Sequence, residues 1–174
     1  HSKNTRSSLS HNTVYSIYED HNGILWVGTH DGTLHQYDPK IDGFKKKLLG
    51  NNGLGPICQS SSGTFWIGSM KGLIKYDPKT EEIKTYLNDP KNPNSLSRNT
   101  IFSMFIDSDD NIWIGTQGGG LNKFDPKTEA FTIYKHDPKN LTNKSVNANT
   151  IMAIYQDKQK RLWIATYGGG LNCL

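Results

Sequence analysis

The sequence places its most reactive side chains in patterns that do not build a known metal or redox centre. It has six histidines and two cysteines. No pair of histidines has the His-Glu-x-x-His spacing of a zinc protease, and no Cys-x-x-Cys pair is present. Cys58 and Cys173 are far apart, and two cysteines do not make a disulfide framework. We therefore predict no metal site and no cofactor.

One acidic segment, 107–111, begins like a calcium-binding loop. The sixth position of such a loop should be glycine, and the twelfth should be glutamate. Here Ile112 and Gly118 stand at those two positions. The segment is better interpreted as a hairpin turn that leads into Trp113.

The chain also lacks the usual signatures of catalysis. No Gly-x-Ser-x-Gly motif is present, and the triple glycines at 118–120 and 168–170 lead into predicted strands, not into the helix that a phosphate-binding loop requires. Most aspartates recur at equivalent places of a repeat, as turn-forming residues do. These periodic aspartates are Asp20, Asp107 and Asp157 in one place, and Asp38, Asp77 and Asp125 in another. We predict no catalytic residues, and a glycan-active enzyme is the less favoured alternative.

The elements that position these residues repeat along the chain. Four tryptophans, Trp26, Trp66, Trp113 and Trp163, are separated by 40, 47 and 50 residues. Each is followed by an apolar residue, then Gly or Ala, then Thr or Ser. Each unit has short runs rich in Ile, Val, Tyr, Phe and Thr between turn residues, and no window has the period of an amphipathic helix. The four tryptophans are predicted to be structural.

Four strands in a unit of about 40–50 residues are typical of a β-propeller blade. The predicted fold is all-β, with four blades of four-stranded antiparallel sheets, of which the last lacks its outer strand. That gives 15 strands in one partial propeller domain over 1–174, with repeats at 8–50, 51–94, 95–144 and 145–174. We expect the tryptophans to lie between neighbouring blades. The first run of each unit, for example Val14 to Tyr18, should be buried on both faces because it is apolar throughout.

The segment from Asp20 to Pro39 carries the fullest copy of the motif Asp-x-x-Gly-x-x-Trp-x-Gly-Thr-x-x-Gly-x-Leu-x-x-Tyr-Asp-Pro. This motif resembles the two-component regulator propeller repeat, which occurs in the periplasmic sensor regions of bacterial hybrid two-component systems. The resemblance implies a non-catalytic, ligand-sensing propeller in an inner-membrane protein with a histidine kinase module. It also implies a response to oligosaccharides and signalling to transcription control.

Composition agrees with a globular domain that binds neither nucleic acid nor membrane. The 174 residues carry a net charge of +4, and several lysines follow a turn proline, where they form a solvated rim. The longest apolar runs are far too short to cross a bilayer, and no signal-peptide pattern is present.

Positions at which the repeats differ are the candidates for ligand contact. The turn between the second and third strands presents His30, Met70, Gln117 and Tyr167, and the turn before the first strand presents Arg98. Antiparallel alternation places both turns on one face, where an aromatic ring with polar neighbours suits a sugar. Drift on unconstrained loops is the alternative explanation for each of these residues.

The missing outer strand of the last unit leaves open sheet edges and open blade faces, which invite pairing. We expect self-association or contact with remaining blades of a longer chain. A closed four-blade ring and an open arc are the alternatives. A protein-interaction scaffold is the second candidate function.

Overall fold

The computed structural model describes residues 7–139 and 146–174, which form four antiparallel sheets and contain no helix. The first sheet consists of β1 (Val14–Glu19), β2 (Leu25–Thr29), β3 (Thr33–Asp38) and β4 (Gly43–Leu48). The second consists of β5 (Leu54–Gln59), β6 (Phe65–Ser69), β7 (Gly72–Tyr76) and β8 (Ile83–Tyr86). The third consists of β9 (Ile101–Ile106), β10 (Ile112–Thr116), β11 (Gly120–Asp125) and β12 (Ala130–Tyr134). The last consists of β13 (Ile151–Gln156), β14 (Leu162–Thr166) and β15 (Gly170–Cys173). These fifteen strands confirm the predicted blades, including the three-stranded last one.

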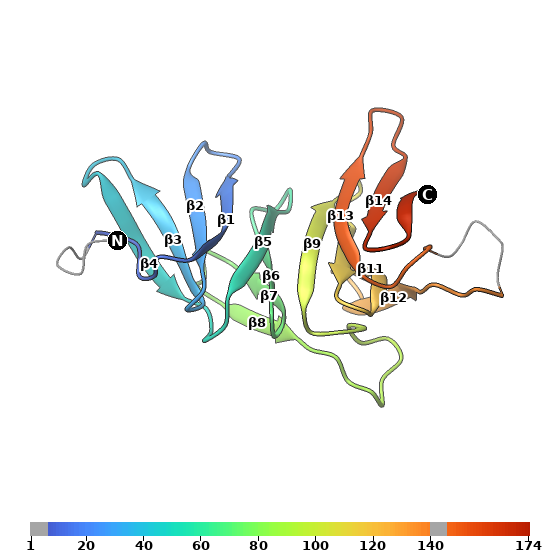
Figure 1. The fold of residues 1–174 in the computed structure, drawn as a ribbon. Coiled ribbons are helices and arrows are strands. Elements are labelled where there is room, and N and C mark those ends of the chain that lie inside the picture. Colours follow the sequence, from blue (N-terminus) through green and yellow to red (C-terminus); the bar gives the residue numbers. More distant parts are fainter. Residues whose placement is uncertain (1–6, 140–145) are drawn as a thin grey trace.

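The four sheets stand face to face in chain order and form an open arc (Figure 1). Their first strands contact one another in the order β1, β5, β9 and β13, so these strands line the inner side of the arc. The first and last sheets lie at opposite ends of it (Figure 1). The chain is therefore an arc of blades in this structure, not a closed four-blade ring.

In three of the four sheets, a carboxylate in the turn between the first and second strands fixes the local fold. Asp20 accepts hydrogen bonds from the amides of Asn22 and Ile24, at 2.9 and 3.0 Å, and from the indole N–H of Trp26 at 2.8 Å. Burial alone would raise the pKa of Asp20, but these three donors outweigh it and the pKa is lowered. The turn, the strand that follows and the orientation of the tryptophan are thus tied to one side chain.

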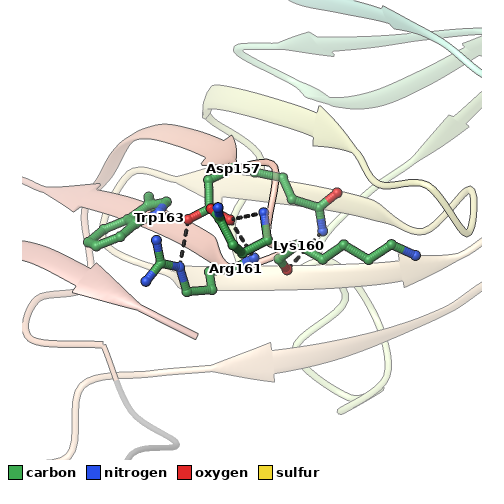
Figure 2. Close-up of polar contacts among 6 residues, drawn as sticks. Asp157, Lys160, Arg161 and Trp163 are labelled. Atoms are coloured by element: carbon green, nitrogen blue, oxygen red, sulfur yellow. Dashed lines mark hydrogen bonds and ion pairs between the residues drawn. The ribbon is translucent and has the colours of Figure 1, made fainter.

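The third and fourth sheets repeat this arrangement. Asp107 accepts from the Trp113 indole at 2.9 Å, and Asp157 accepts from the Trp163 indole at 2.8 Å. Figure 2 shows the fourth copy, in which the Arg161 guanidinium also donates to Asp157. The fixed six-residue separation of Asp and Trp is the sequence signal for this bond, but the sequence alone suggested only a turn role for these aspartates.

The core lies between the sheets, as predicted from the tryptophans. Trp26 packs on Phe65 of the second sheet, with ring centroids 4.7 Å apart, and Trp66 packs on Phe124 of the third at 5.3 Å. Trp113 packs on the cluster that contains Ile164 of the last sheet. Trp163 is on the face of the last sheet that no further described blade covers, and the Arg161 guanidinium lies 5.3 Å from its ring centroid.

The Gly or Ala two positions after each tryptophan allows this close packing. A Cβ on Gly28 would lie 2.9 Å from the Leu54 carbonyl oxygen, and a Cβ on Gly115 would lie 2.7 Å from the Cβ of Ile151. Both contacts are with the inner strand of the next sheet. Glycine at these positions therefore sets how closely two blades approach.

The prediction that every first strand is buried on both faces is wrong for the two end sheets: Tyr155 of β13 is 63 % exposed, and β1 is open as well. Val14 is 38 % exposed and Ile17 is 70 % exposed, whereas Ile101 and Met104 of β9 are buried. β9 has a sheet on each side, but one face of β1 lies at the end of the arc. Burial of an inner strand therefore depends on its two neighbouring blades, which its own residue pattern does not reveal.

Candidate functional site

One face of the arc carries the variable turns; it is called the upper face here, although the view in Figure 1 places it at the bottom. The turn between the second and third strands of each sheet is tied to the segment that precedes the first strand. The amide of His30 donates to the carbonyl of Thr13, that of Gln117 to Thr100 and that of Tyr167 to Thr150. In the second sheet the amide of Gly72 donates to Asn99 of the next repeat. Both kinds of turn thus lie on the same face, as antiparallel alternation predicted.

Each inner strand carries a β-bulge next to this face. The register shifts between Val14 and Ser16 in β1 and between Leu54 and Ile57 in β5. It also shifts beside Ile101 in β9 and between Ile151 and Ala153 in β13. A bulge re-aims the extra side chain away from the regular alternation of the strand.

The residues at these bulges are exposed in three of the strands and half-buried in β5, and they are mostly apolar. They are Tyr15, Gly55 with Pro56, Phe102 and Met152. Tyr15 is 45 % and Phe102 is 40 % exposed. Sequence analysis missed them because a bulge leaves the apolar run uninterrupted. Their place one residue into each first run is the only sequence signal that distinguishes them.

Three of these bulges border an apolar pocket of about 320 Å³. Tyr15 and Phe102 line it together with Met70, one of the residues predicted to contact a ligand. The Tyr15 hydroxyl hydrogen-bonds Nδ1 of His30 at 3.0 Å, so His30 supports one wall. Gly53 is required there, since a Cβ on it would collide with the ring of Tyr15.

A polar pocket of about 330 Å³ adjoins the apolar one, and Thr100 lines both. Arg98 and Gln117, two further predicted contacts, line this second pocket with Asn88. The structure therefore brings Met70, Arg98 and Gln117 around Thr100. Tyr167 is 75 % exposed and lines neither of these two pockets.

Buried hydrogen bonds hold the segments that carry these residues. Asn122 of β11 accepts from the amide of Ser97 at 2.9 Å, which fixes the backbone next to Arg98. In the first repeat His35 takes the equivalent position, with its Nε2 3.0 Å from the Ser10 hydroxyl. Burial lowers the pKa of His35. The rim residues thus stand on a rigid support.

The geometry is that of a recognition surface. Arg98 and Gln117 offer hydrogen-bond donors on one side, where the Asn88 amide group already donates to the carbonyls of Leu96 and Ser97. The Tyr15 and Phe102 rings offer apolar faces on the other side. Within residues 7–139 and 146–174, no group of three or more His, Cys, Asp or Glu side chains is placed to hold a metal ion.

Known proteins share both the repeat and the fold. The sequence profile of the two component regulator propeller family matches residues 8–31, 95–118 and 145–168. The chain is built from two-component regulator propeller repeats. A curated relative, histidine kinase P4 of Formosa agariphila, is 31 % identical over 128 residues, which are 68 % of this chain and 9 % of that protein.

Solved structures show the same repeat in sensor proteins. The extracellular domain of the putative hybrid two component system BT4673 from B. thetaiotaomicron has a TM-score of 0.79 and 26 % identity, over 97 % of this chain and 22 % of that one. The corresponding domain of BT3049 has a TM-score of 0.71 and 28 % identity, over 95 % and 22 %. The WD40 propeller of Doa1, at 11 % identity and a TM-score of 0.73, shows the fold alone.

These regulator-propeller repeats span about a fifth of the solved sensor domains and about a tenth of the curated kinase. The chain is thus a propeller segment of the kind found in the extracellular part of two-component sensors. Among the described residues, no helix has the length and apolar character needed to cross a membrane.

Proposed function

We propose that this propeller segment is a non-catalytic, ligand-sensing part of a periplasmic sensor in a bacterial two-component system, and that it recognises an oligosaccharide on its upper face. The observation that carries the proposal is the pair of adjoining pockets around Thr100. One is walled by Tyr15, Phe102 and Met70, and the other by Arg98 and Gln117.

Sugar chemistry matches this division. A pyranose ring has apolar faces of C–H groups, which pack on aromatic and thioether side chains, and a polar edge of hydroxyls. The rings of Tyr15 and Phe102 would contact the faces, while Arg98, Gln117 and Asn88 would bond the hydroxyls. Two pockets side by side accommodate consecutive sugar units better than a single monosaccharide.

The signalling step would be a change in relative domain orientation. Stacked blades with a shared core are rigid, and a ligand shifts an equilibrium only by binding one of two states more tightly. We infer that ligand at the upper face favours one packing of the propeller against the rest of an inner-membrane sensor, whose kinase module then signals to transcription control.

The experiment is calorimetric titration of the chain with a panel of oligosaccharides. At least one is expected to bind, and Phe102→Ala or Arg98→Ala should weaken it about tenfold or more. Ile41→Ala is the matched control, because Ile41 is 55 % exposed but lines neither pocket. Silence across the panel, or equal loss in the control, contradicts the proposed site. Formation of a cleaved product contradicts the non-catalytic assignment.

The open faces at the two ends of the arc favour a second proposal, that other blades of this repeat cover them. On the last sheet, Tyr155 is 63 % exposed and Leu171 is 61 % exposed, both beside Trp163. The first sheet exposes Ile17. Inside the arc, equivalent residues are covered: Leu121 is buried against the last sheet and Ile57 against the first.

The two end faces are therefore the two complementary halves of one blade interface. They fit head to tail, as heterologous interfaces do. The covering blades would come from the remainder of a longer chain or from a second copy, and in the latter case the protein would also act as an interaction scaffold.

A further inference from the structure

The second repeat breaks the Asp–Trp rule of the other three. Ser60 stands where Asp20, Asp107 and Asp157 stand. The backbone of the turn is unchanged: the Ser60 amide donates to the Thr64 carbonyl and the Gly63 amide to the Ser60 carbonyl, both at 2.9 Å. The same two bonds, at 2.9 Å, form the turn at Asp20. The turn is preserved and its carboxylate is absent.

This substitution leaves three N–H donors without their usual acceptor. They are the amides of Ser62 and Thr64 and the indole of Trp66, the counterparts of the donors that hold Asp20. Within the described residues no acceptor is recorded for any of the three. The Ser60 hydroxyl instead bonds the Ser62 hydroxyl and the Thr64 carbonyl. The Trp66 side chain is 2 % exposed and lines a groove, so its indole N–H is free to bond a group that enters from outside.

A groove of about 480 Å³ opens at this point between the second and third sheets, and Trp66 lines it. The charged residues along it are Lys75, Lys127, Asp109, Asp110 and Asp125. The Lys75 ammonium lies 6.0 Å from the centroid of the Trp66 ring. A cation thus accompanies the three donors, while the carboxylates of the groove come from the third sheet.

Two of these carboxylates already have partners. Asp110 accepts from the amide of Ser61, and Asp125 accepts from the amide of Lys127. Together with Asp109 they can accept further hydrogen bonds, and they disfavour a ligand that is only an anion. A ligand that fits both ends of the groove has an acceptor at one end and donors at the other.

We propose that this groove binds a small polyhydroxy acid whose carboxylate takes the place of the missing aspartate, against the Trp66 indole and the amides of Ser62 and Thr64. Three sister repeats hold a carboxylate with the same donors at 2.8–3.0 Å, so the occupant's chemistry is displayed by the fold itself. The hydroxyls of the ligand donate to the aspartates of the third sheet. The site is separate from the upper-face pockets and does not depend on them.

Indole N–H signals in a ¹H–¹⁵N spectrum of the ¹⁵N-labelled chain test this proposal directly. Four tryptophans give four signals, and Trp66→Phe identifies the one of interest. D-glucuronate is expected to shift the Trp66 signal saturably. Acetate should shift the same signal only at concentrations at least tenfold higher, because it lacks the hydroxyls. D-glucose should leave it in place.

Ser60→Asp is the decisive variant, since it restores the repeat's own carboxylate. We expect it to weaken glucuronate binding at least tenfold while the chain remains folded. Gln159→Asp adds the same charge to the turn of the last blade, on an exposed residue outside the groove, and should bind as the parent does.

Each other outcome overturns a stated part of the proposal. No shift with any probe, or undiminished binding in Ser60→Asp, removes the site. An equal shift of the Trp66 signal with glucose would show that the ligand's carboxylate is not needed for binding. Acetate binding as tightly as glucuronate removes the role of the hydroxyls. These outcomes do not depend on the upper-face pockets. If no oligosaccharide binds there, the results expected for the groove stay the same.

Discussion

At the scale of single residues, one carboxylate does most to define the inner hairpin in three of the four blades. Asp107 joins the amides of Asp109 and Asn111 and the Trp113 indole in one cluster. We expect Asp107→Ala to lower the free energy of unfolding by about 1–3 kcal/mol, because three donors, two of them part-buried, lose their acceptor. Ser60→Asp should change it in the opposite direction, by about 1 kcal/mol. Urea unfolding of both variants measures this, and equal midpoints would refute the role of the carboxylate.

The same carboxylates predict how stability depends on pH. Hydrogen bonds lower the pKa of Asp20 and Asp107 against the effect of burial, and they lower that of Asp157 to about 2. A pKa lower in the folded state adds stability above the unfolded value of about 3.9, and this stability is lost as pH falls toward the folded value. The urea concentration at the unfolding midpoint should therefore decrease as the pH is lowered from about 4 to about 2.

A variant with asparagine at all three positions provides the control for the pH prediction. It keeps an acceptor for the indole but has no proton to bind in this range. Its urea midpoint should depend less on pH below 4 than that of the parent. An identical pH dependence would mean that other carboxylates cause the acid sensitivity.

At the scale of elements, close approach of neighbouring sheets controls packing. A side chain at Gly115 would press against Ile151 of the next inner strand. We expect Gly115→Ala to cost about 1–3 kcal/mol, since overpacked cores force shifts in the backbone. Gly50→Ala is the control, because a Cβ on Gly50 meets nothing within 4 Å. Thermal unfolding of both would test this, and similar melting temperatures would contradict it.

The inner strands also show which part of an element the sequence could not disclose. Runs rich in Ile, Val, Tyr, Phe and Thr between turn residues predicted these strands. The bulges at Tyr15 and Phe102 were not predicted, because a bulge is a mismatch between two paired strands. It has no signature in one strand alone.

At the scale of the whole molecule, the two ends of the arc should govern association. Ile17→Lys on the first sheet and Leu171→Lys on the last place a charge on opposite halves of the same interface. If a second copy covers these faces, sedimentation should show dimers or larger assemblies of the parent that either substitution disrupts. The other outcome is a monomeric parent that binds a hydrophobic dye, which both variants bind less well. That result would assign the faces to further blades of a longer chain. Behaviour unchanged by the substitutions would refute both.

The sequence by itself determined the blade: its four tryptophans, its strands, its turn residues and the face on which the variable turns lie. These follow from local chemistry, because strand alternation, turn preference and repeat spacing are all written within a few tens of residues. It also predicted Met70, Arg98 and Gln117 as variable rim positions, and their contact with a ligand remains a prediction. Only the tertiary structure decided which of them share a pocket, which inner strand is exposed, and that a groove between two blades opens beside Trp66. Those features arise between blades, where residues some 40–50 positions apart meet, and no single repeat contains the information on its neighbour.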